Sequence, residues 1–301
     1  ATQFVPEFGW SKGIDYSIFH SISAFCNAGI DIIGNFRSVT PYSQNPVILL
    51  TIAALIVIGG LGFFVWQEIY YFKDTKKLSL HSKIVIVSTV FLIVAGSILM
   101  FIFEMDNPKT IGNMSMKGKI LSSIFAAVVP RTAGFNSIPT ADMTGPGIFL
   151  TMLLMFIGGS PGSTAGGIKT TTAALLIITV ISVIKGREDA EIYGRRIRKE
   201  IVYRALVVTT LGIGIVMIAT IILCMTEKPA SLEYILYEVI SAFGTVGLTL
   251  GLTPDLSVPG KMILSFIMYA GRLGPLTLAL SLARKTIPGT IKYPEDKILI
   301  G

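Results

Sequence analysis

The 301-residue sequence predicts an all-α integral membrane protein that is built from repeated units of a helix, a half-helix, a glycine loop and a second helix. Its composition is 52% hydrophobic and only 14% charged, whereas a soluble domain has about 25% charged residues. Apolar runs that reach the ~20 residues needed to cross a bilayer core lie at 46–72, 84–103, 147–184, 201–225 and 260–283. A soluble helical protein would place polar residues at a 3.6-residue period, and these runs contain almost none.

Positive charge is distributed unevenly along the chain. The net charge is +7, and most of the 25 Lys and Arg residues lie in segments 73–83 and 185–204 and in the tail after residue 283. By the positive-inside rule these segments face the cytoplasm, which places the glycine loops outside and the C-terminus inside. The basic composition therefore reports membrane orientation, and no nucleic-acid partner is expected.

Three stretches of the chain share one pattern: HSISAFCNAGIDI (20–32), SIFAAVVPRTAGFNSI (123–138) and YEVISAFGTVGLTLG (237–251). In each stretch an apolar segment of about 10–12 residues, which is too short to span a membrane, leads to a glycine. These glycines are Gly29, Gly134 and Gly247. Each apolar segment is therefore expected to form a half-helix that enters the membrane from outside.

A second glycine-rich segment follows each loop in the same phase: IGGLGF (58–63), IGGSPGSTAGG (157–167) and AGRLGP (270–275). Gly60, Gly159 and Gly271 are taken as the corresponding positions. The predicted units are residues 1–80, which lack a first helix, and the complete repeats 81–190 and 191–301. Two periodicities that agree with the charge distribution indicate a true repeat.

Such a unit is suited to conduct a cation. Non-helical backbone at membrane depth is tolerated only where it is buried in protein or lines a water-filled cavity. Glycine permits positive φ, so loop carbonyls can face a common axis and replace the hydration shell of K⁺, and each half-helix directs its negative C-terminal end toward that axis. The repeats predict a potassium-channel-like pore; the alternative is three re-entrant turns that pack within a helical bundle.

The segment from 158 to 167 interrupts an apolar run. Glycine costs about 1 kcal/mol and proline about 3 kcal/mol inside a helix, so no continuous helix is expected. The glycine loops at Gly29, Gly134 and Gly247 would form the ion filter of such a pore, and a loop below this filter could gate it. The candidate gate residues are Gly158, Gly159, Ser160, Pro161, Gly162, Ser163, Thr164, Ala165, Gly166 and Gly167. The alternatives are a helix-packing face with glycine at every fourth residue and a nucleotide-binding P-loop in GSTAGGIKT, in which Ile168 interrupts the motif.

Two basic residues lie within apolar runs. Arg272 precedes Arg284 by twelve residues, about 18 Å at helical rise, which is too deep for its side chain to extend to the cytoplasm. We expect its guanidinium to contact the carbonyls of the 158–167 loop and to hold the closed form. Lys169 follows the loop, where a water-filled inner cavity could solvate it, and both residues belong to the candidate gate.

The segments VVPRTAGFNS, SAFGTVGLTLGLTP and GGSPGSTAGGIKTTT resemble the Trk/Ktr/HKT superfamily of potassium transporters, and they are most similar to the membrane subunit of bacterial Ktr systems. The resemblance covers nearly the whole chain from about Gly9 onward. It implies four repeats around a single pore, of which this sequence shows the C-terminal three. A four-sided pore does not close on three walls, so the missing filter loop is expected in further upstream sequence.

The resemblance implies that K⁺ binds the backbone carbonyls of Cys26, Asn27, Ala28 and Gly29, of Arg131, Thr132, Ala133 and Gly134, and of Gly244, Thr245, Val246 and Gly247. It also implies a gate loop at 158–167 and a homodimer in the bacterial plasma membrane. A cytosolic ring of nucleotide-binding regulatory subunits is the implied partner. K⁺ is the expected transported ion, with Na⁺ as an alternative, and no cofactor is expected in this chain.

Other functions are compared by their sequence features. Na⁺ permeation or coupling within the same superfamily is typical of members with a serine in place of a filter glycine, and all three visible loops contain glycine. An alternating-access carrier also uses broken helices but is typically built from inverted repeats, whereas these repeats have the same orientation. The spans contain no paired aspartates, Ser–His arrangement or HExxH motif, so no enzyme activity is expected.

Overall fold

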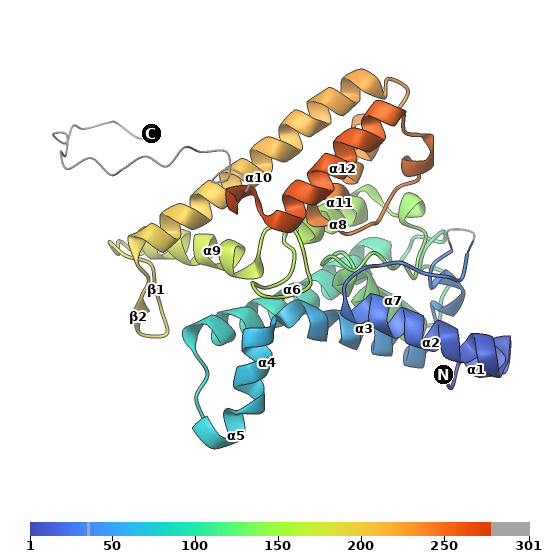
Figure 1. Ribbon diagram of the computed structural model, residues 1–301, viewed down its shortest axis with the longest axis horizontal. Coiled ribbons are helices and arrows are strands. Elements are labelled where there is room, and N and C mark those ends of the chain that lie inside the picture. The colour runs from blue at the N-terminus through green and yellow to red at the C-terminus, as the bar shows by residue number, and fades with distance from the viewer. Residues whose placement is uncertain (35–36, 278–301) are drawn as a thin grey trace.

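The structure is a computed structural model that describes residues 1–34 and 37–277, and most of its elements are helices (Figure 1). The first segment contains α1 (Phe4–Phe8), α2 (Trp10–Phe25), α3 (Pro46–Leu61), α4 (Phe63–Tyr70) and α5 (Phe72–Thr75). The second contains α6 (Leu80–Glu104), α7 (Met116–Val128), α8 (Gly145–Phe156) and α9 (Thr170–Ile184). The third contains the hairpin β1 (Glu191–Ile192) and β2 (Arg195–Arg196), then α10 (Lys199–Thr226), α11 (Leu232–Gly244) and α12 (Val258–Leu273).

One local order recurs in all three segments. A half-helix (α2, α7 or α11) is followed by a loop, a short 3₁₀ turn and an inner helix (α3, α8 or α12). Each inner helix begins at a polar cap whose side-chain oxygen accepts from the first turn: Asn45 from Val47 N at 3.0 Å, Thr144 from Gly147 N at 3.2 Å and Ser257 from Gly260 N at 3.1 Å. A proline in the first two helical positions favours the same start.

The helices fall short of the predicted spans at two places. The helices α6 and α10 are long and apolar enough to cross a membrane, and α3 with α4 forms a third apolar segment that bends by 98°. The apolar runs 46–72 and 260–283 are therefore each interrupted within the described residues. Gly62 and Gly274, each at φ 89°, end α3 and α12, because a left-handed residue cannot continue a right-handed helix.

The helices form two groups around a central region of loops (Figure 1). Helices α10 and α12 lie on one side and α2 and α3 on the other, with α7 and α8 between them. One large hydrophobic core joins elements from all three segments, while a small second core forms around the buried residues Leu175, Ala190, Ile197 and Ala205. Large apolar side chains such as Phe91 and Ile218 are exposed, as expected of surfaces that face lipid.

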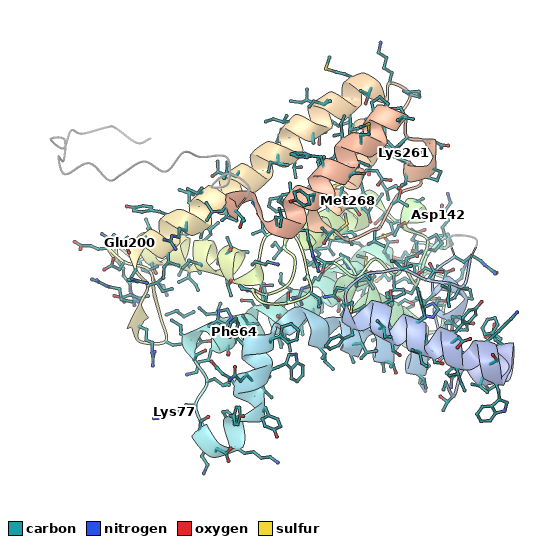
Figure 2. The ribbon with its side chains drawn as sticks, in the orientation of Figure 1. Phe64, Lys77, Asp142, Glu200, Lys261 and Met268 are labelled. Atoms are coloured by element: carbon teal, nitrogen blue, oxygen red, sulfur yellow. The ribbon has the colours of Figure 1, made fainter. Side chains whose placement is uncertain are left out.

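The two ends of the molecule differ in the chain segments that they contain. Figure 2 shows Lys77 and Glu200 at one end and Asp142 and Lys261 toward the other. Lys77 and Glu200 belong to segments that the positive-inside rule assigns to the cytoplasm, and Asp142 and Lys261 belong to the intervening segments. The two kinds of segment therefore lie toward opposite ends of the molecule, and which end faces the cytoplasm stays a prediction.

A buried glutamate at the C-terminal end of each long helix binds the cap of the next inner helix, and we call this pair of contacts the carboxylate clamp. Glu104 accepts from Thr144 N at 2.8 Å and from Thr144 Oγ1 at 2.7 Å. Glu227 accepts from Ser257 N at 3.1 Å and from the Ser257 hydroxyl. The hydrogen bonds from Ser257 hold the pKa of the Glu227 carboxyl below its usual value of 4.5.

We predict that Glu227→Ala lowers the free energy of unfolding by about 1–3 kcal/mol, because it removes hydrogen bonds to a charged group and leaves Ser257 without its partner. A carboxyl whose pKa is depressed by folding stabilises the protein above its unfolded pKa, and this contribution is lost as the pH falls through the folded pKa. Thermal unfolding from pH 3 to 7 should show this acid step in the wild type and a smaller step in the variant. Glu233→Ala, at an exposed position of α11, is the control, and an equal loss in both variants would contradict the clamp.

Candidate ion pathway

The three glycine loops, which are far apart in sequence, meet at one place. A Cβ atom on Gly29 would lie 2.7 Å from the Cα of Gly134, and a Cβ atom on Gly134 would lie 3.1 Å from the Cα of Gly29. The Cβ position of Gly247 lies 3.9 Å from the Cα of Gly134. The predicted filter glycines are neighbours in space, and the absence of side chains at Gly29 and Gly134 permits this approach. Their role as K⁺ ligands stays a prediction.

Each predicted filter segment, at 26–29, 131–134 and 244–247, contains two residues with positive φ. The glycines Gly29, Gly134 and Gly247 have φ of 67°, 76° and 89°, and two residues earlier Asn27, Thr132 and Thr245 have φ of 51°, 78° and 52°. The glycines were predictable from the sequence, whereas the earlier position was not predicted; a β-branched threonine is an outlier at such a φ. The available signal was the recurring spacing of Asn or Thr two residues before the glycine.

Serines of two half-helices brace the loops that follow them. The hydroxyl of Ser23 donates to the carbonyl of Ile30 at 2.7 Å, and the hydroxyl of Ser241 accepts from the amide of Gly247 at 3.2 Å. Both serines lie six residues before the loop glycine, but nothing in the sequence distinguishes them from other helical serines. With these braces the half-helices hold their C-terminal ends, which attract cations, next to the loops.

A second brace lies on the far side of the third loop. Glu238 of α11 is buried and accepts hydrogen bonds from the hydroxyls of Thr249 and Thr253, the latter at 2.6 Å. The hydroxyl of Thr140, after the second loop, donates to the carbonyl of Thr249 at 2.5 Å. The second and third loops are thereby tied to each other and to one half-helix.

The other predicted filter residues differ in their surroundings. Arg131 is buried, and its Nη2 donates to Thr89 Oγ1 of α6 at 3.4 Å. Among the described residues no carboxylate pairs with it. Its side chain therefore leaves the loop toward α6, so only its carbonyl remains a candidate ligand. Gly244 is the last residue of α11, so the third loop begins at Thr245.

The segment 158–167 is a non-helical loop between α8 and α9, as the sequence predicted. Its ends are joined by an isolated bridge in which Gly158 N donates to the carbonyl of Ile168 at 2.9 Å. Because these glycines do not lie on a helix, the helix-packing alternative is wrong. The P-loop alternative fails as well, since the helix α8 precedes the glycines instead of a strand.

The 158–167 loop contacts the non-glycine residue with positive φ in each filter loop, namely Asn27, Thr132 and Thr245. Thr164 Oγ1 lies 3.1 Å from Asn27 Nδ2 and also hydrogen bonds to the carbonyl of Gly59 at 3.2 Å. A Cβ atom on Gly158 would lie 3.2 Å from Thr132 Cγ2, and one on Gly166 would lie 2.9 Å from Thr245 Cγ2. The 158–167 loop thus packs against all three filter loops at their shared level.

Two basic side chains donate hydrogen bonds to backbone carbonyls of the 158–167 loop. Nη1 of Arg272 donates to the carbonyl of Thr164, as the sequence predicted, and Nζ of Lys169 donates to the carbonyl of Ala165 at 2.5 Å. Arg272 lies in the last turn of α12. The expected continuous helix from Arg272 to Arg284 does not form, because α12 ends at Leu273, and Arg284 lies outside the described residues.

The structure also corrects the alignment of the inner helices. A Cβ atom on Gly59 would overlap the carbonyl oxygen of Phe25, and a Cβ atom on Gly271 would overlap that of Phe243. Gly59, and not Gly60 as expected, is therefore the counterpart of Gly271. It follows that Arg272 of α12 corresponds to Gly60 of α3. Of these two helices, α12 therefore contacts the 158–167 loop through a charged side chain and α3 does not.

A bundle of apolar helices in which three half-helices of one chain bring glycine loops to a shared centre defines the class of pore-loop membrane proteins. Residues 3–290 match the model of the TrkH family, described as cation transport protein. The chain belongs to this family, which confirms the resemblance to the Trk/Ktr/HKT superfamily.

Similar proteins agree with this assignment. The chain is 44% identical over 303 residues to the potassium/sodium uptake protein NtpJ of Enterococcus hirae and 40% identical over 299 residues to the Ktr system potassium uptake protein B of Bacillus subtilis. It covers 66% of each of these relatives, and each alignment includes 99% of this chain. The chain thus spans about two thirds of the length of these curated relatives.

The fold has a solved counterpart. The crystal structure of the potassium transporter TrkH from Vibrio parahaemolyticus aligns with a TM-score of 0.75 and 20% sequence identity, over 89% of this chain and 58% of that one. At this identity the likeness concerns the fold alone. It confirms the predicted all-α membrane architecture with pore loops.

Proposed function

We propose that this chain forms three walls of the pore of a potassium uptake system. The observation that carries the proposal is the meeting of Gly29, Gly134 and Gly247 in loops with alternating left-handed residues at the ends of three half-helices. Such loops offer backbone carbonyls to a dehydrated cation. The names of the Enterococcus and Bacillus relatives support K⁺ as the ion.

The gate in this proposal is the 158–167 loop. It packs against all three filter loops, and Arg272 and Lys169 donate to its carbonyls. A loop without helical hydrogen bonds can move at a lower free-energy cost than a packed helix. Opening requires that Thr164 exchange its contacts with Asn27, Gly59 and Arg272 for water or other partners.

The membrane orientation and the partners belong to the same proposal. The filter loops face the outside of a bacterial plasma membrane and the basic segments face the cytoplasm. The Bacillus relative is named as a component of a Ktr system, which supports assembly with a regulatory subunit. We infer a homodimer on a cytosolic ring of nucleotide-binding subunits, with the basic segment 185–200 as a docking region.

Ion flux tests the pore. The full-length protein in liposomes should admit K⁺ at least tenfold faster than Na⁺ under the same gradient, with protein-free liposomes as the blank. Equal rates would favour the second candidate, a Na⁺-permeable transporter, which the name of the Enterococcus relative supports. Flux of neither ion above the blank would overturn the proposed function.

A further inference from the structure

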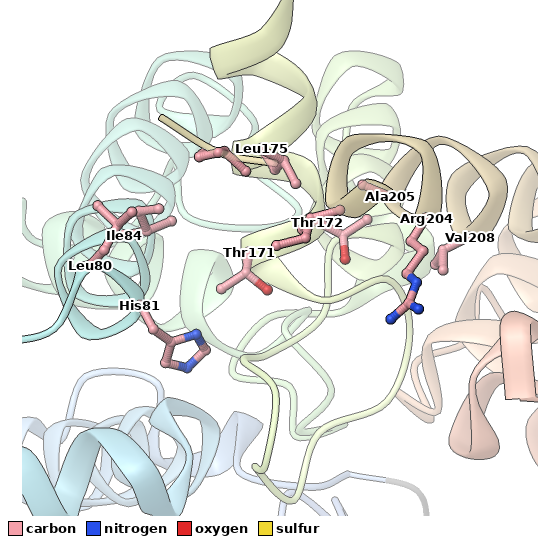
Figure 3. Close-up of a pocket in the computed structure, with 11 residues that line it drawn as sticks. Leu80, His81, Ile84, Thr171, Thr172, Leu175, Arg204, Ala205 and Val208 are labelled. Atoms are coloured by element: carbon pink, nitrogen blue, oxygen red, sulfur yellow. The ribbon is translucent and has the colours of Figure 1, made fainter. Parts of the chain in front are cut away.

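A cavity of about 360 Å³ lies between α6, α9 and α10, away from the filter loops (Figure 3). It is at the end of the molecule that contains the basic segments. Four of its lining residues are polar, namely His81, Thr171, Thr172 and Arg204, and the other seven are aliphatic. A mostly aliphatic cavity that is lined by a few polar groups matches an amphiphilic ligand.

Of the polar groups, the exposed guanidinium of Arg204 is free to bind a ligand. Figure 3 shows His81 and Arg204 on opposite sides of Thr171 and Thr172. The Nε2 atom of His81 is buried and has no hydrogen-bond partner. Within residues 1–34 and 37–277 Arg204 forms no ion pair, and a guanidinium is suited to bind phosphate through two parallel hydrogen bonds.

Three carboxylates of the surrounding segments already have partners. Asp189 pairs with Arg196 at 3.2 Å, and Glu191 pairs with Arg187 at 2.9 Å. Glu68, on the α4 side of His81, accepts from Ser79 N at 2.9 Å. Glu200 lies four residues before Arg204 on α10, but within the described residues it forms no ion pair with Arg204, whose guanidinium therefore has no carboxylate partner at the edge of the cavity.

Helix ends add to this positive potential. Lining residues come from the first turns of α6 and α9, at His81 and at Thr171 and Thr172, and from the second turn of α10, at Arg204. The N-terminal end of a helix carries a partial positive charge and unpaired amide groups, which favour anions. Three such ends at one cavity favour an anionic group over a cation.

We propose that the cavity binds an anionic phospholipid of the cytoplasmic leaflet, with the headgroup phosphate at Arg204 and an acyl chain against the aliphatic lining. Basic pockets between helices on the cytoplasmic side are suited to such headgroups. Inorganic phosphate or a free nucleotide shares the phosphate chemistry, but neither would fill a lining of seven aliphatic residues. Binding of the lipid therefore requires both Arg204 and the aliphatic lining of the cavity.

The site is placed to act on the 158–167 loop, and this part of the inference rests on the proposed function. Thr171 and Thr172 follow Lys169 directly on α9, and α9 packs against the small second core instead of the main one. In the described arrangement the cavity is present and the loop contacts the filter loops. A ligand that binds this arrangement shifts the equilibrium toward it, so the lipid favours the closed loop.

Lipid binding is measured on the full-length protein by native mass spectrometry with phosphatidylglycerol and with phosphatidylcholine. We expect Arg204→Gln to lower retention of phosphatidylglycerol at least fivefold and Val208→Phe, which fills the apolar part, to lower it similarly. Arg195→Gln, an exposed arginine of β2 at the same end, should leave it unchanged. Equal loss in the Arg204 and Arg195 variants, or no preference for the anionic lipid, would overturn the site.

Two further measurements distinguish a lipid from a soluble phosphate as the ligand and test the effect of the ligand on K⁺ flux. Inorganic phosphate and glycerol phosphate at millimolar concentration should not displace the lipid; displacement that depends on Arg204 would identify a soluble phosphate as the ligand and overturn the lipid. Phosphatidylglycerol should lower K⁺ flux severalfold in the wild type and leave Arg204→Gln unaffected. Arg204-dependent binding without an effect on flux would overturn the link to the loop, and absence of all ion flux would overturn the proposed function while the binding result stands.

Discussion

Gly134→Ser in the full-length protein is expected to reduce the preference for K⁺ over Na⁺ by at least tenfold. A Cβ atom at this position would overlap the carbonyl oxygen of Val246 and lie 3.1 Å from the Cα of Gly29. Because those atoms are backbone, a filter loop must move to accommodate the side chain. The serine also disfavours the φ of 76° that this residue adopts, and a displaced carbonyl ring loses its match to the ion.

Gly247→Ser separates the effect of steric overlap from the effect of backbone strain. Its Cβ would lie 3.9 Å from the nearest atom, which is ordinary contact, but its φ of 89° is unfavourable for serine. We therefore expect a smaller loss of selectivity than for Gly134→Ser. Gly34 has the same φ of 89° in open space, so Gly34→Ser is the control for backbone strain away from the filter.

The measurement is K⁺ and Na⁺ flux per folded protein in liposomes, with the folded fraction determined by size-exclusion chromatography. Selectivity that is unchanged in both filter variants would rule out these loops as the carbonyl filter. Selectivity that falls equally in the Gly34 variant would assign the effect to general strain.

Arg272→Ala is expected to raise K⁺ flux severalfold without loss of selectivity, because the carbonyl of Thr164 then loses its cationic donor. Thr164→Val should act in the same direction, since it keeps the shape of the side chain and removes the hydroxyl that binds Asn27 and Gly59. Shortening the 158–167 loop should also raise flux. The double variant of Arg272 and Thr164 should be non-additive, because both residues restrain one loop and members of one network couple.

A purely structural role for these contacts gives a different result. Both single changes would then lower expression and the midpoint of thermal unfolding, and flux would fall with the amount of protein. Lys261→Ala, at an exposed position of the same helix, is the matched control. Flux at or below the wild-type value in both single variants, at equal folded protein, would remove the gate hypothesis.

The parts of the fold that were predictable are those that composition encodes locally. Five glycines and one proline in 158–167 are incompatible with a helix, and the loop is present where these residues lie. A single glycine carries much less information, because it costs only about 1 kcal/mol and the apolar run continues past it. The breaks at Gly62 and Gly274 were therefore missed.

Most contacts between distant segments could not be predicted from the sequence. Glu104 binds a cap 40 residues away and Glu227 a cap 30 residues away, and a lone glutamate after an apolar run gives no sign of its partner. The contact of Arg272 with the 158–167 loop was predictable, because a charge inside an apolar run needs a partner at the same depth. The equivalence of Gly59 with Gly271 required the packing against Phe25 and Phe243.

The left-handed threonines have a consequence for the heat resistance of the protein. A β-branched residue at positive φ raises the free energy of the folded state by about 1–3 kcal/mol, and Thr132 and Thr245 each do so. The corresponding residue of the first loop is Asn27, a type that adopts this conformation more readily. Laboratory selection for heat resistance alone is therefore expected to replace Thr245 with asparagine.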